Sequence, residues 1–332
     1  MSNARINWLD TAKSLGILLV VFGHLSSFGW MTIYSFHMPL FFFMAGIVFK
    51  SEGSFKNFFI KKLRSLYVPY IAFLIIEYMI YFISHYHTLM FKDYAVMFIK
   101  QLLGMGLSSD AYLWNGSIWF LCALFFAEMV FFFISKANNN WVLAATFVLA
   151  LIGSVYFKYD LPFALKYVFP ACMFLSLGLL FRKANCFNIE KCHAWLCVLI
   201  AVGCCTVICF TARINGEVGM RGCVYGDNLI VFFLNAFLGI CAVIFLSVLF
   251  RNINILQFYG KNSIIILCLH LYFTNKLVPL VLNLLSVEEN MPGFLLVECI
   301  SVIVIFALFY PLITLINKYV PFVFGRKFKN VP

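Results

Sequence analysis

Residues 7 to 46 read NWLDTAKSLGILLVVFGHLSSFGWMTIYSFHMPLFFFMAG, and this stretch decides the fold class. From Ser14 to Phe49 the chain contains no Asp, Glu, Lys or Arg, although it contains two histidines. A membrane helix needs roughly 20 apolar residues, so the uncharged stretch is long enough to cross a bilayer twice. It therefore predicts two membrane helices that carry polar groups at their edges and inside them.

The composition extends this prediction to the whole chain of 332 residues. Hydrophobic residues make up 64% and charged residues 11%, whereas a soluble domain carries roughly 25% charged residues. The apolar runs are long and do not alternate with polar residues, which favours helices over a β-barrel. We expect an all-α polytopic membrane protein with one domain over residues 1–332. We also expect the first apolar run to be retained as a helix, because no small-residue cleavage site follows it.

Ten apolar runs predict about ten transmembrane helices. They cover residues 7–27, 34–49, 65–84, 116–134, 141–157, 163–181, 195–211, 229–250, 262–285 and 294–317. Most of the 24 Lys and Arg residues fall on the side that holds both termini, so the positive-inside rule places both termini in the cytoplasm. The net charge of +11 then reflects topology, and it does not indicate nucleic-acid binding. Membrane lipid or a CoA phosphate is the more natural anionic partner.

Asp10, Lys13 and His24 share one face of the first predicted helix. Lys13 and His24 are eleven residues apart, so they differ by roughly 20° around the axis and stand roughly 16 Å apart along it. Polar groups at such depth commonly face a wet cavity and mark function, and an imidazole suits proton transfer. His24 is therefore the first catalytic candidate, with a histidine that merely bonds two helices as the alternative. Asp10 and Lys13 could form an interfacial ion pair or position other groups.

Two further histidines lie in predicted spans. His37 falls at the start of the second predicted helix, at a depth similar to that of His24, and could meet it across the hairpin. A structural partner for His24 is an equally good reading of His37. His270 lies eight residues into the span 262–285, where a substrate contact and an ordinary core histidine are equally good readings.

Other polar and aromatic residues are candidates for ligand binding. Lys61, Lys62 and Arg64 lie in a basic inner loop, where they set topology and could also bind the phosphates of CoA. Trp119, near the outer end of its predicted helix, could stack on a sugar or belong to an interfacial aromatic belt. Arg221 lies in the outer loop 212–228, where it could bind a saccharide or simply be solvated.

Several short motifs, in order, resemble the membrane acyltransferase-3 family. Lys13, ten residues and His24 resemble its Arg-x10-His signature, with Lys in the place of Arg. The segment HMPLFFFMAG at 37–46 is similar to the fucose 4-O-acetylase-like branch of that family. The resemblance continues at 66–70, at 117–121 and from 260 to 270, so it covers nearly the whole chain.

The resemblance implies an O-acetyltransferase of the bacterial cytoplasmic membrane. Such an enzyme moves an acetyl group from acetyl-CoA to a hydroxyl of an envelope or exported saccharide, or of its lipid-linked precursor. The roles that we expect are catalysis by His24, Lys13, Asp10 and His37, CoA binding by Lys61, Lys62 and Arg64, and saccharide binding by Trp119, His270 and Arg221. We expect no metal site, because the 12 cysteines form no Cys-x-x-Cys pair. A homo-oligomer is compatible with the sequence.

Two other classes of protein would also account for parts of the sequence. A transporter or flippase of an envelope saccharide would suit ten helices with scattered buried polar residues, although no internal repeat is evident. A membrane scaffold would leave the polar face of the first predicted helix unexplained.

Overall fold

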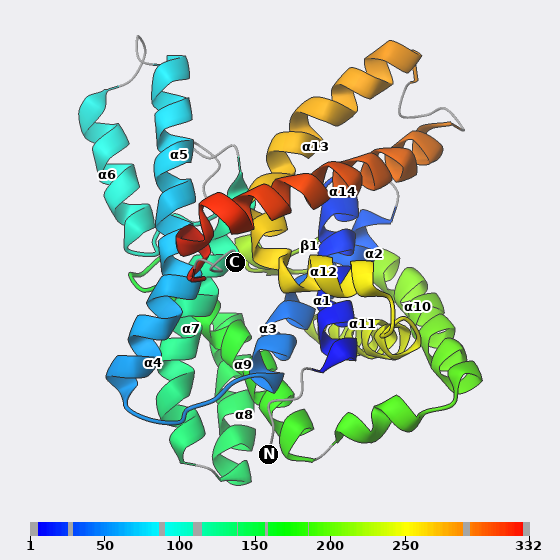
Figure 1. Cartoon of the computed structure of the whole chain (residues 1–332). Helices are drawn as coiled ribbons and strands as arrows, with labels where there is room; N and C mark the ends of the chain where they lie inside the picture. Colours follow the sequence, from blue (N-terminus) through cyan, green and yellow to red (C-terminus); the bar gives the residue numbers. More distant parts are fainter. Residues whose placement is uncertain are drawn as a thin grey trace. The chain divides into compact units, whose positions relative to one another are not determined.

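The computed structural model of the chain describes residues 6–25, 29–85, 90–108, 115–137, 139–156, 159–184, 186–287 and 293–327. Two compact units divide the chain between them. The first unit comprises Met1–Ala45, Phe181–Met220 and Val224–Leu312, and the second comprises Gly46–Leu180, Arg221–Cys223 and Ile313–Pro332. The described residues are mainly helical, as Figure 1 shows, so the prediction of an all-α protein is confirmed.

The described parts of both units consist mainly of helices joined by short irregular segments, with one short pair of antiparallel strands in the first unit. The first unit contains all or most of α1 (Asn7–Gly23), α2 (Trp30–Tyr34), α3 (His37–Ile47), η3 (Cys186–Lys191), α10 (Ala194–Asn215), β1 (Val218–Gly219), β2 (Val224–Tyr225), α11 (Leu229–Leu249), α12 (Asn254–Lys261), α13 (Ser263–Leu285) and α14 (Phe294–Tyr319). The second contains all or most of α4 (Phe55–Lys62), η1 (Leu63–Tyr67), α5 (Val68–His85), α6 (Phe91–Leu102), η2 (Gly116–Ile118), α7 (Trp119–Lys136), α8 (Asn140–Tyr156), α9 (Leu165–Lys183), η4 (Met220–Gly222) and η5 (Pro321–Phe324).

Eight helical segments of the described part are long and apolar enough to cross a membrane. They are Trp30–Ile47, Phe55–His85, Gly116–Lys136, Leu165–Lys183, Ala194–Asn215, Leu229–Leu249, Ser263–Leu284 and Phe294–Tyr319. Two predicted spans fall outside this set, because α1 and α8 each have only 17 residues. The eight segments fit a multi-pass membrane protein, whereas the number ten and the cytoplasmic termini stay predictions.

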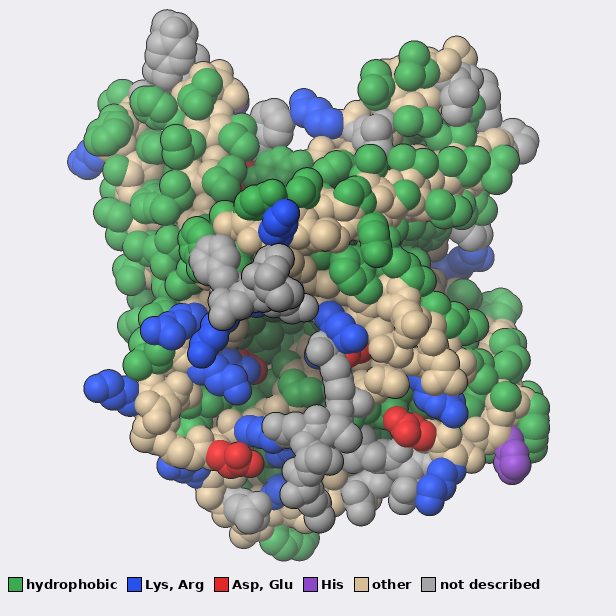
Figure 2. Space-filling view, in the orientation of Figure 1, with side chains coloured by type: hydrophobic (Ala, Val, Ile, Leu, Met, Phe, Trp, Pro, Cys, Tyr) green, Lys and Arg blue, Asp and Glu red, His purple; other side chains and the backbone are tan. Residues whose placement is uncertain are grey.

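Large apolar side chains are exposed along the outward faces of these helices. On α5 and α6 they include Ile75, Met79, Ile83, Phe91 and Ile99, and Figure 2 shows this part of the second unit largely covered by hydrophobic side chains. An exposed apolar surface of this extent is unusual for a soluble protein and suits contact with lipid tails.

The helix α1 lies at the centre of the first unit. It packs against α2, α11, α12 and α13, and its side chains of Trp8, Ala12 and Ile17 are fully buried. Lipid tails are as apolar as leucine, so membrane helices associate mainly by close packing at small residues. At Gly16 on α1, a Cβ atom would lie 3.1 Å from the Leu40 side chain of α3. Small residues thus bring α1 close to its neighbours.

The closest approach to α1 is made by Gly260 on α12. A Cβ atom at this position would lie 1.7 Å from the carbonyl oxygen of Asp10, so no side chain larger than hydrogen fits there. Gly260 opens the Gly-Lys-Asn-Ser motif, which leads into α13. The glycine of this motif therefore serves to seat α12 on the backbone of α1.

In the second unit, a π-helical turn interrupts the long helix that runs from α4 through α5. The turn η1 spans Leu63–Tyr67, and the N–H of Val68 donates to the carbonyl of Leu63, five residues earlier. Pro69 follows directly, and its ring would clash with the carbonyl four residues before it in a regular α-helix. A local π turn relieves that clash, and such turns are frequent at functional sites.

Candidate functional site

His24 immediately follows the last turn of α1. Its backbone is still helical, with φ −87° and ψ −8°, and its N–H donates to the carbonyl of Val20. The imidazole is exposed and lies against the ring of Tyr34, with 5.8 Å between the ring centroids. Nδ1 of His24 is 3.0 Å from the Tyr34 hydroxyl, close enough for a hydrogen bond whose donor depends on the tautomer. One ring nitrogen of His24 is thus engaged by a phenol.

Tyr34 also contacts His37. Their ring centroids are 4.9 Å apart, so the tyrosine ring touches both histidines of the N-terminal hairpin. His37 is only 5% exposed, and its Nδ1 lies 2.9 Å from the carbonyl oxygen of Ile33. Because a carbonyl can only accept, Nδ1 of His37 must be the protonated nitrogen, and in the neutral ring Nε2 carries the free lone pair.

His270 approaches the same place from α13. It is fully buried, and its ring centroid lies 5.2 Å from that of His24, with an interplanar angle of 43°. Its Nδ1 is 2.9 Å from the carbonyl oxygen of Leu267 and 3.2 Å from that of Ile266. The described residues offer no hydrogen-bond partner to its Nε2.

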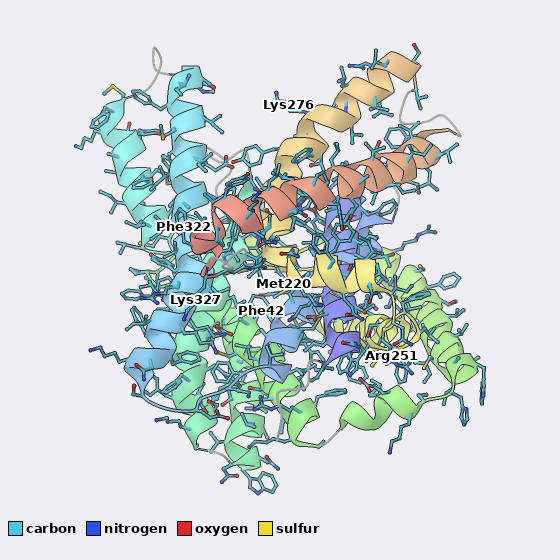
Figure 3. All side chains as sticks on the ribbon, in the orientation of Figure 1. Phe42, Met220, Arg251, Lys276, Phe322 and Lys327 are labelled. Atoms are coloured by element: carbon cyan, nitrogen blue, oxygen red, sulfur yellow. The ribbon has the colours of Figure 1, made fainter. Side chains whose placement is uncertain are left out.

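We call His24, Tyr34, His37 and His270 the histidine cluster. All four belong to the first unit. His24 and His37, which we expected could meet across the hairpin, both contact the ring of Tyr34. Figure 3 shows the side chains of this unit as sticks, with Phe42 labelled on α3, the helix that carries His37. Among the described residues no set of three or more His, Cys, Asp or Glu is placed to hold a metal ion.

Asp10 and Lys13 lie near the other end of α1. The helix is continuous over Asn7–Gly23, so Lys13 and His24 are roughly 16 Å apart along the axis. Asp10 is 5% exposed and sits under Gly260, whereas Lys13 is half-buried. The catalytic roles that we expect for Asp10 and Lys13 thus require a site that extends along α1, away from the histidine cluster.

The three cations expected to bind CoA lie in the second unit, at the junction of α4 and η1. Lys61 and Arg64 are exposed. Lys62 instead forms a 2.6 Å ion pair with Oε1 of Glu128 on α7, whose side chain is 1% exposed. A buried carboxylate needs such a partner, because removing one member leaves an uncompensated charge. Lys62 therefore also holds α4 to α7, while Lys61 and Arg64 present their charges outward.

Trp119 and Arg221, both expected to bind saccharide, come together in the second unit around Tyr167. The ring centroids of Trp119 and Tyr167 are 5.1 Å apart, and the Tyr167 hydroxyl donates a hydrogen bond to the carbonyl of Arg221 at 3.0 Å. Nε of Arg221 donates to the carbonyl of Leu107 at 2.9 Å. Trp119 is only 5% exposed, so a sugar could stack on its ring only after the packing around it has opened.

Two residues of these sites were missed by the sequence analysis. Tyr34 stands three residues before His37, one helical turn away, and this spacing could have drawn attention to it. Glu128 lies within the predicted span 116–134, but nothing in the sequence pairs it with Lys62, because the two are far apart along the chain.

Comparison with known proteins identifies the family. The acyltransferase-3 family model, described as an acyltransferase domain, matches residues 6–318. The chain has no match among curated proteins or solved structures. The matched range contains the histidine cluster, the basic junction of α4 and η1, and the Trp119–Arg221 pair. The chain belongs to the acyltransferase-3 family and is a membrane acyltransferase.

Proposed function

We propose that this acyltransferase moves an acetyl group from cytoplasmic acetyl-CoA to a hydroxyl of an envelope or exported saccharide, with His24 at the reacting centre. The observation that carries the proposal is the setting of the His24 imidazole. It is accessible, it is bonded through Nδ1 to Tyr34, and it has a second imidazole beside it. This is the chemistry that acyl transfer between a thioester and an alcohol requires, namely a proton acceptor held in a defined orientation.

In this mechanism Nδ1–H of His24 donates to the Tyr34 oxygen, and Nε2 faces the substrates. Nε2 takes the proton of the acceptor hydroxyl while the oxygen of that hydroxyl attacks the carbonyl carbon of the thioester. The carbon–sulfur bond breaks, and the departing thiolate receives the proton from Nε2. An alternative order is attack by Nε2 itself to form an acetyl-histidine, and both orders use the same nitrogen.

The donor is proposed to contact the second unit through its phosphates. Lys61 and Arg64 are exposed, and neither forms an ion pair with a described residue, so they are the better phosphate ligands of the three candidates. Lys62 contributes less charge to a ligand because Glu128 already neutralises it. The acceptor is proposed to be a saccharide or lipid-linked saccharide that uses Trp119, Arg221 and His270, and the bacterial inner membrane is the proposed location.

The fucose 4-O-acetylase-like branch remains the proposed subgroup, on the strength of the segment 37–46. A transporter or flippase of saccharides is not favoured, because the family match covers nearly the whole chain and describes an acyltransferase.

Reconstituted protein supplied with radiolabelled acetyl-CoA tests the proposal. We expect label to move into an alkali-labile ester on saccharide extracted from the envelope, and free CoA to appear in equal amount. Saccharide that crosses the vesicle membrane without gaining label would overturn the proposal in favour of transport.

A further inference from the structure

The chain after α14 packs against the basic junction of α4 and η1. The short turn η5 (Pro321–Phe324) contacts both η1 and α5. Its Phe324 ring is buried, with its centroid 6.1 Å from that of the buried Phe73 on α5. Residues from Ile313 onward belong to the second unit, as do Lys61 and Arg64. The segment that follows α14 is therefore fixed beside two of the cations that we propose bind the donor.

Gly325 seats this segment on the backbone of Arg64. Its φ is +66°, in the left-handed region that favours glycine. Its N–H donates to the carbonyl of Phe322 at 3.0 Å, and the N–H of Arg326 donates to the carbonyl of Pro321 at 3.0 Å. These are the two bonds of a Schellman motif, which ends the turn. A Cβ atom at Gly325 would lie 2.7 Å from the carbonyl oxygen of Arg64, so the close approach also requires glycine.

The two residues that follow Gly325 are both cations. Nη1 of Arg326 donates to Oδ1 of Asn317, which ties this guanidinium to the end of α14. Lys327, labelled in Figure 3, is exposed. It stands two residues from Gly325, which is at most about 7 Å of backbone. Because Gly325 touches the carbonyl of Arg64, Lys327 lies in the neighbourhood of Arg64, although the two are far apart along the chain. Figure 2 shows Lys and Arg side chains gathered over this part of the unit.

No described carboxylate neutralises these exposed cations. Lys61, Arg64 and Lys327 form no ion pair with a described residue, and Glu128 on α7 is already paired with Lys62 at 2.6 Å. Like charges held close together repel one another, so an anion between them stabilises the arrangement. A phosphate monoester carries a charge of about −1.5 to −2 at pH 7 and offers three acceptor oxygens. Two cations from different segments match such a group in both charge and number of contacts.

We propose that Lys327 and Arg64 bind the 3′-phosphate of acetyl-CoA from two sides, so that the segment after α14 forms part of the donor site. This rests on the proposed function, in which acetyl-CoA is the donor and Arg64 binds one of its phosphates. The contact by Lys327 and the choice of phosphate are the additions. The 3′-phosphate is the monoester of CoA and projects from the ribose, so two segments can approach it together. Each phosphate of the pyrophosphate is instead flanked by linkages on both sides and carries less charge.

The test is calorimetric binding of two donors, acetyl-CoA and acetyl-3′-dephospho-CoA, to the purified full-length protein in nanodiscs of phosphatidylcholine. Lys327→Ala removes the cation, and Lys327→Arg keeps it. Lys92→Ala is the matched control, because it removes an exposed cation from α6 of the same unit. A second set of nanodiscs contains phosphatidylglycerol, whose anionic headgroup would occupy the site if these cations served to bind lipid. Acetyl transfer by the wild type is measured alongside.

We expect Lys327→Ala to bind acetyl-CoA roughly threefold to tenfold more weakly than the wild type, because one charge-assisted contact is lost. Its affinity for acetyl-3′-dephospho-CoA should equal that of the wild type, since that donor lacks the group that Lys327 contacts. Lys327→Arg and Lys92→Ala should bind both donors as the wild type does. Phosphatidylglycerol should leave the ratio between variant and wild type unchanged.

Equal affinity of Lys327→Ala and the wild type for acetyl-CoA overturns the inference. Equal weakening for both donors also overturns it, because the lost contact is then not to the 3′-phosphate. A difference that appears only in nanodiscs with phosphatidylglycerol assigns Lys327 to a lipid headgroup and overturns it as well. In these three cases acetyl transfer by the wild type leaves the proposed function standing. A wild type that binds neither donor and transfers no acetyl group contradicts the proposed function itself, and the inference falls with it, so the two failures are distinguishable.

Discussion

In the proposed mechanism, Tyr34 determines which nitrogen of His24 faces the substrates. Its hydroxyl is 3.0 Å from Nδ1 of His24, and its ring also lies against the ring of His37. A ring held at Nδ1 presents Nε2 in one direction, in the way that a carboxylate orients the histidine of a serine-type triad. A phenol does this without adding a charge that would be costly within an apolar hairpin.

Tyr34→Phe removes the hydroxyl and keeps the ring. A single hydrogen bond of this kind contributes on the order of 1 kcal/mol, so we expect kcat to fall roughly threefold to tenfold with little change in KM. Steady-state kinetics of acetyl transfer give the result. Tyr272→Phe is the matched control, since it makes the same substitution on α13 outside the cluster. A variant that keeps the wild-type kcat would contradict the orienting role.

A second prediction about single residues concerns the exposed cations Lys61 and Arg64, which we propose bind the phosphates of the donor. Replacing either with Ala should raise the KM for acetyl-CoA roughly threefold to tenfold and leave kcat unchanged, because a charge-assisted phosphate contact acts on binding alone. The effect should shrink with added salt and with a donor that lacks the 3′-phosphate. Lys92→Ala, which removes an exposed cation from α6, is the control. If Lys61→Ala and Arg64→Ala had the same KM for acetyl-CoA as the control Lys92→Ala, the proposal that Lys61 and Arg64 bind the donor would be contradicted.

At the scale of the element, α1 is a helix whose neighbours approach its backbone closely. Gly260 on α12 touches the Asp10 carbonyl, and Gly16 on α1 leaves room for Leu40. Because lipid supplies little hydrophobic drive between helices, such contacts account for much of the packing energy. The position of His24 at the end of α1 therefore depends on two glycines: Gly260 of α12, which packs near the start of α1, and Gly16 in the middle of α1.

Gly260→Ala tests this dependence. A Cβ atom there would lie 1.7 Å from the Asp10 oxygen, so α12 must move, and we expect a loss of about 1–3 kcal/mol or more in stability. Thermal unfolding in detergent measures it as a lower Tm. Gly203→Ala is the matched control, because its Cβ would meet nothing within 4 Å and alanine favours the interior of α10. A Tm for Gly260→Ala at or above that of Gly203→Ala would contradict the packing.

At the scale of the whole molecule, the sequence predicted the helices better than it predicted their contacts. Long apolar runs place helices because every backbone group in lipid must be bonded within its own segment. The boundaries were less accurate: α1 ends at Gly23 where the prediction extended to 27, and α10 continues to Asn215 where it ended at 211.

Contacts between distant segments depend on tertiary packing, which leaves little trace in one sequence. His270 was selected as a residue, but its position beside His24 followed only from the structure. The same holds for Lys62, which was assigned to CoA and also pairs with Glu128. The roles of the candidate residues stay predictions, because the structure gives their contacts and their roles are measured by the activity of variants.

The most direct measurement is the acetyl-transfer rate of purified His24→Ala, compared with that of His193→Ala. His193 is an exposed histidine of the first unit whose side chain makes no cap hydrogen bond. We predict that His24→Ala inserts and purifies as the wild type does but transfers acetyl at least about a hundredfold more slowly, while His193→Ala keeps the full rate. Transfer by His24→Ala at the wild-type rate would contradict the account.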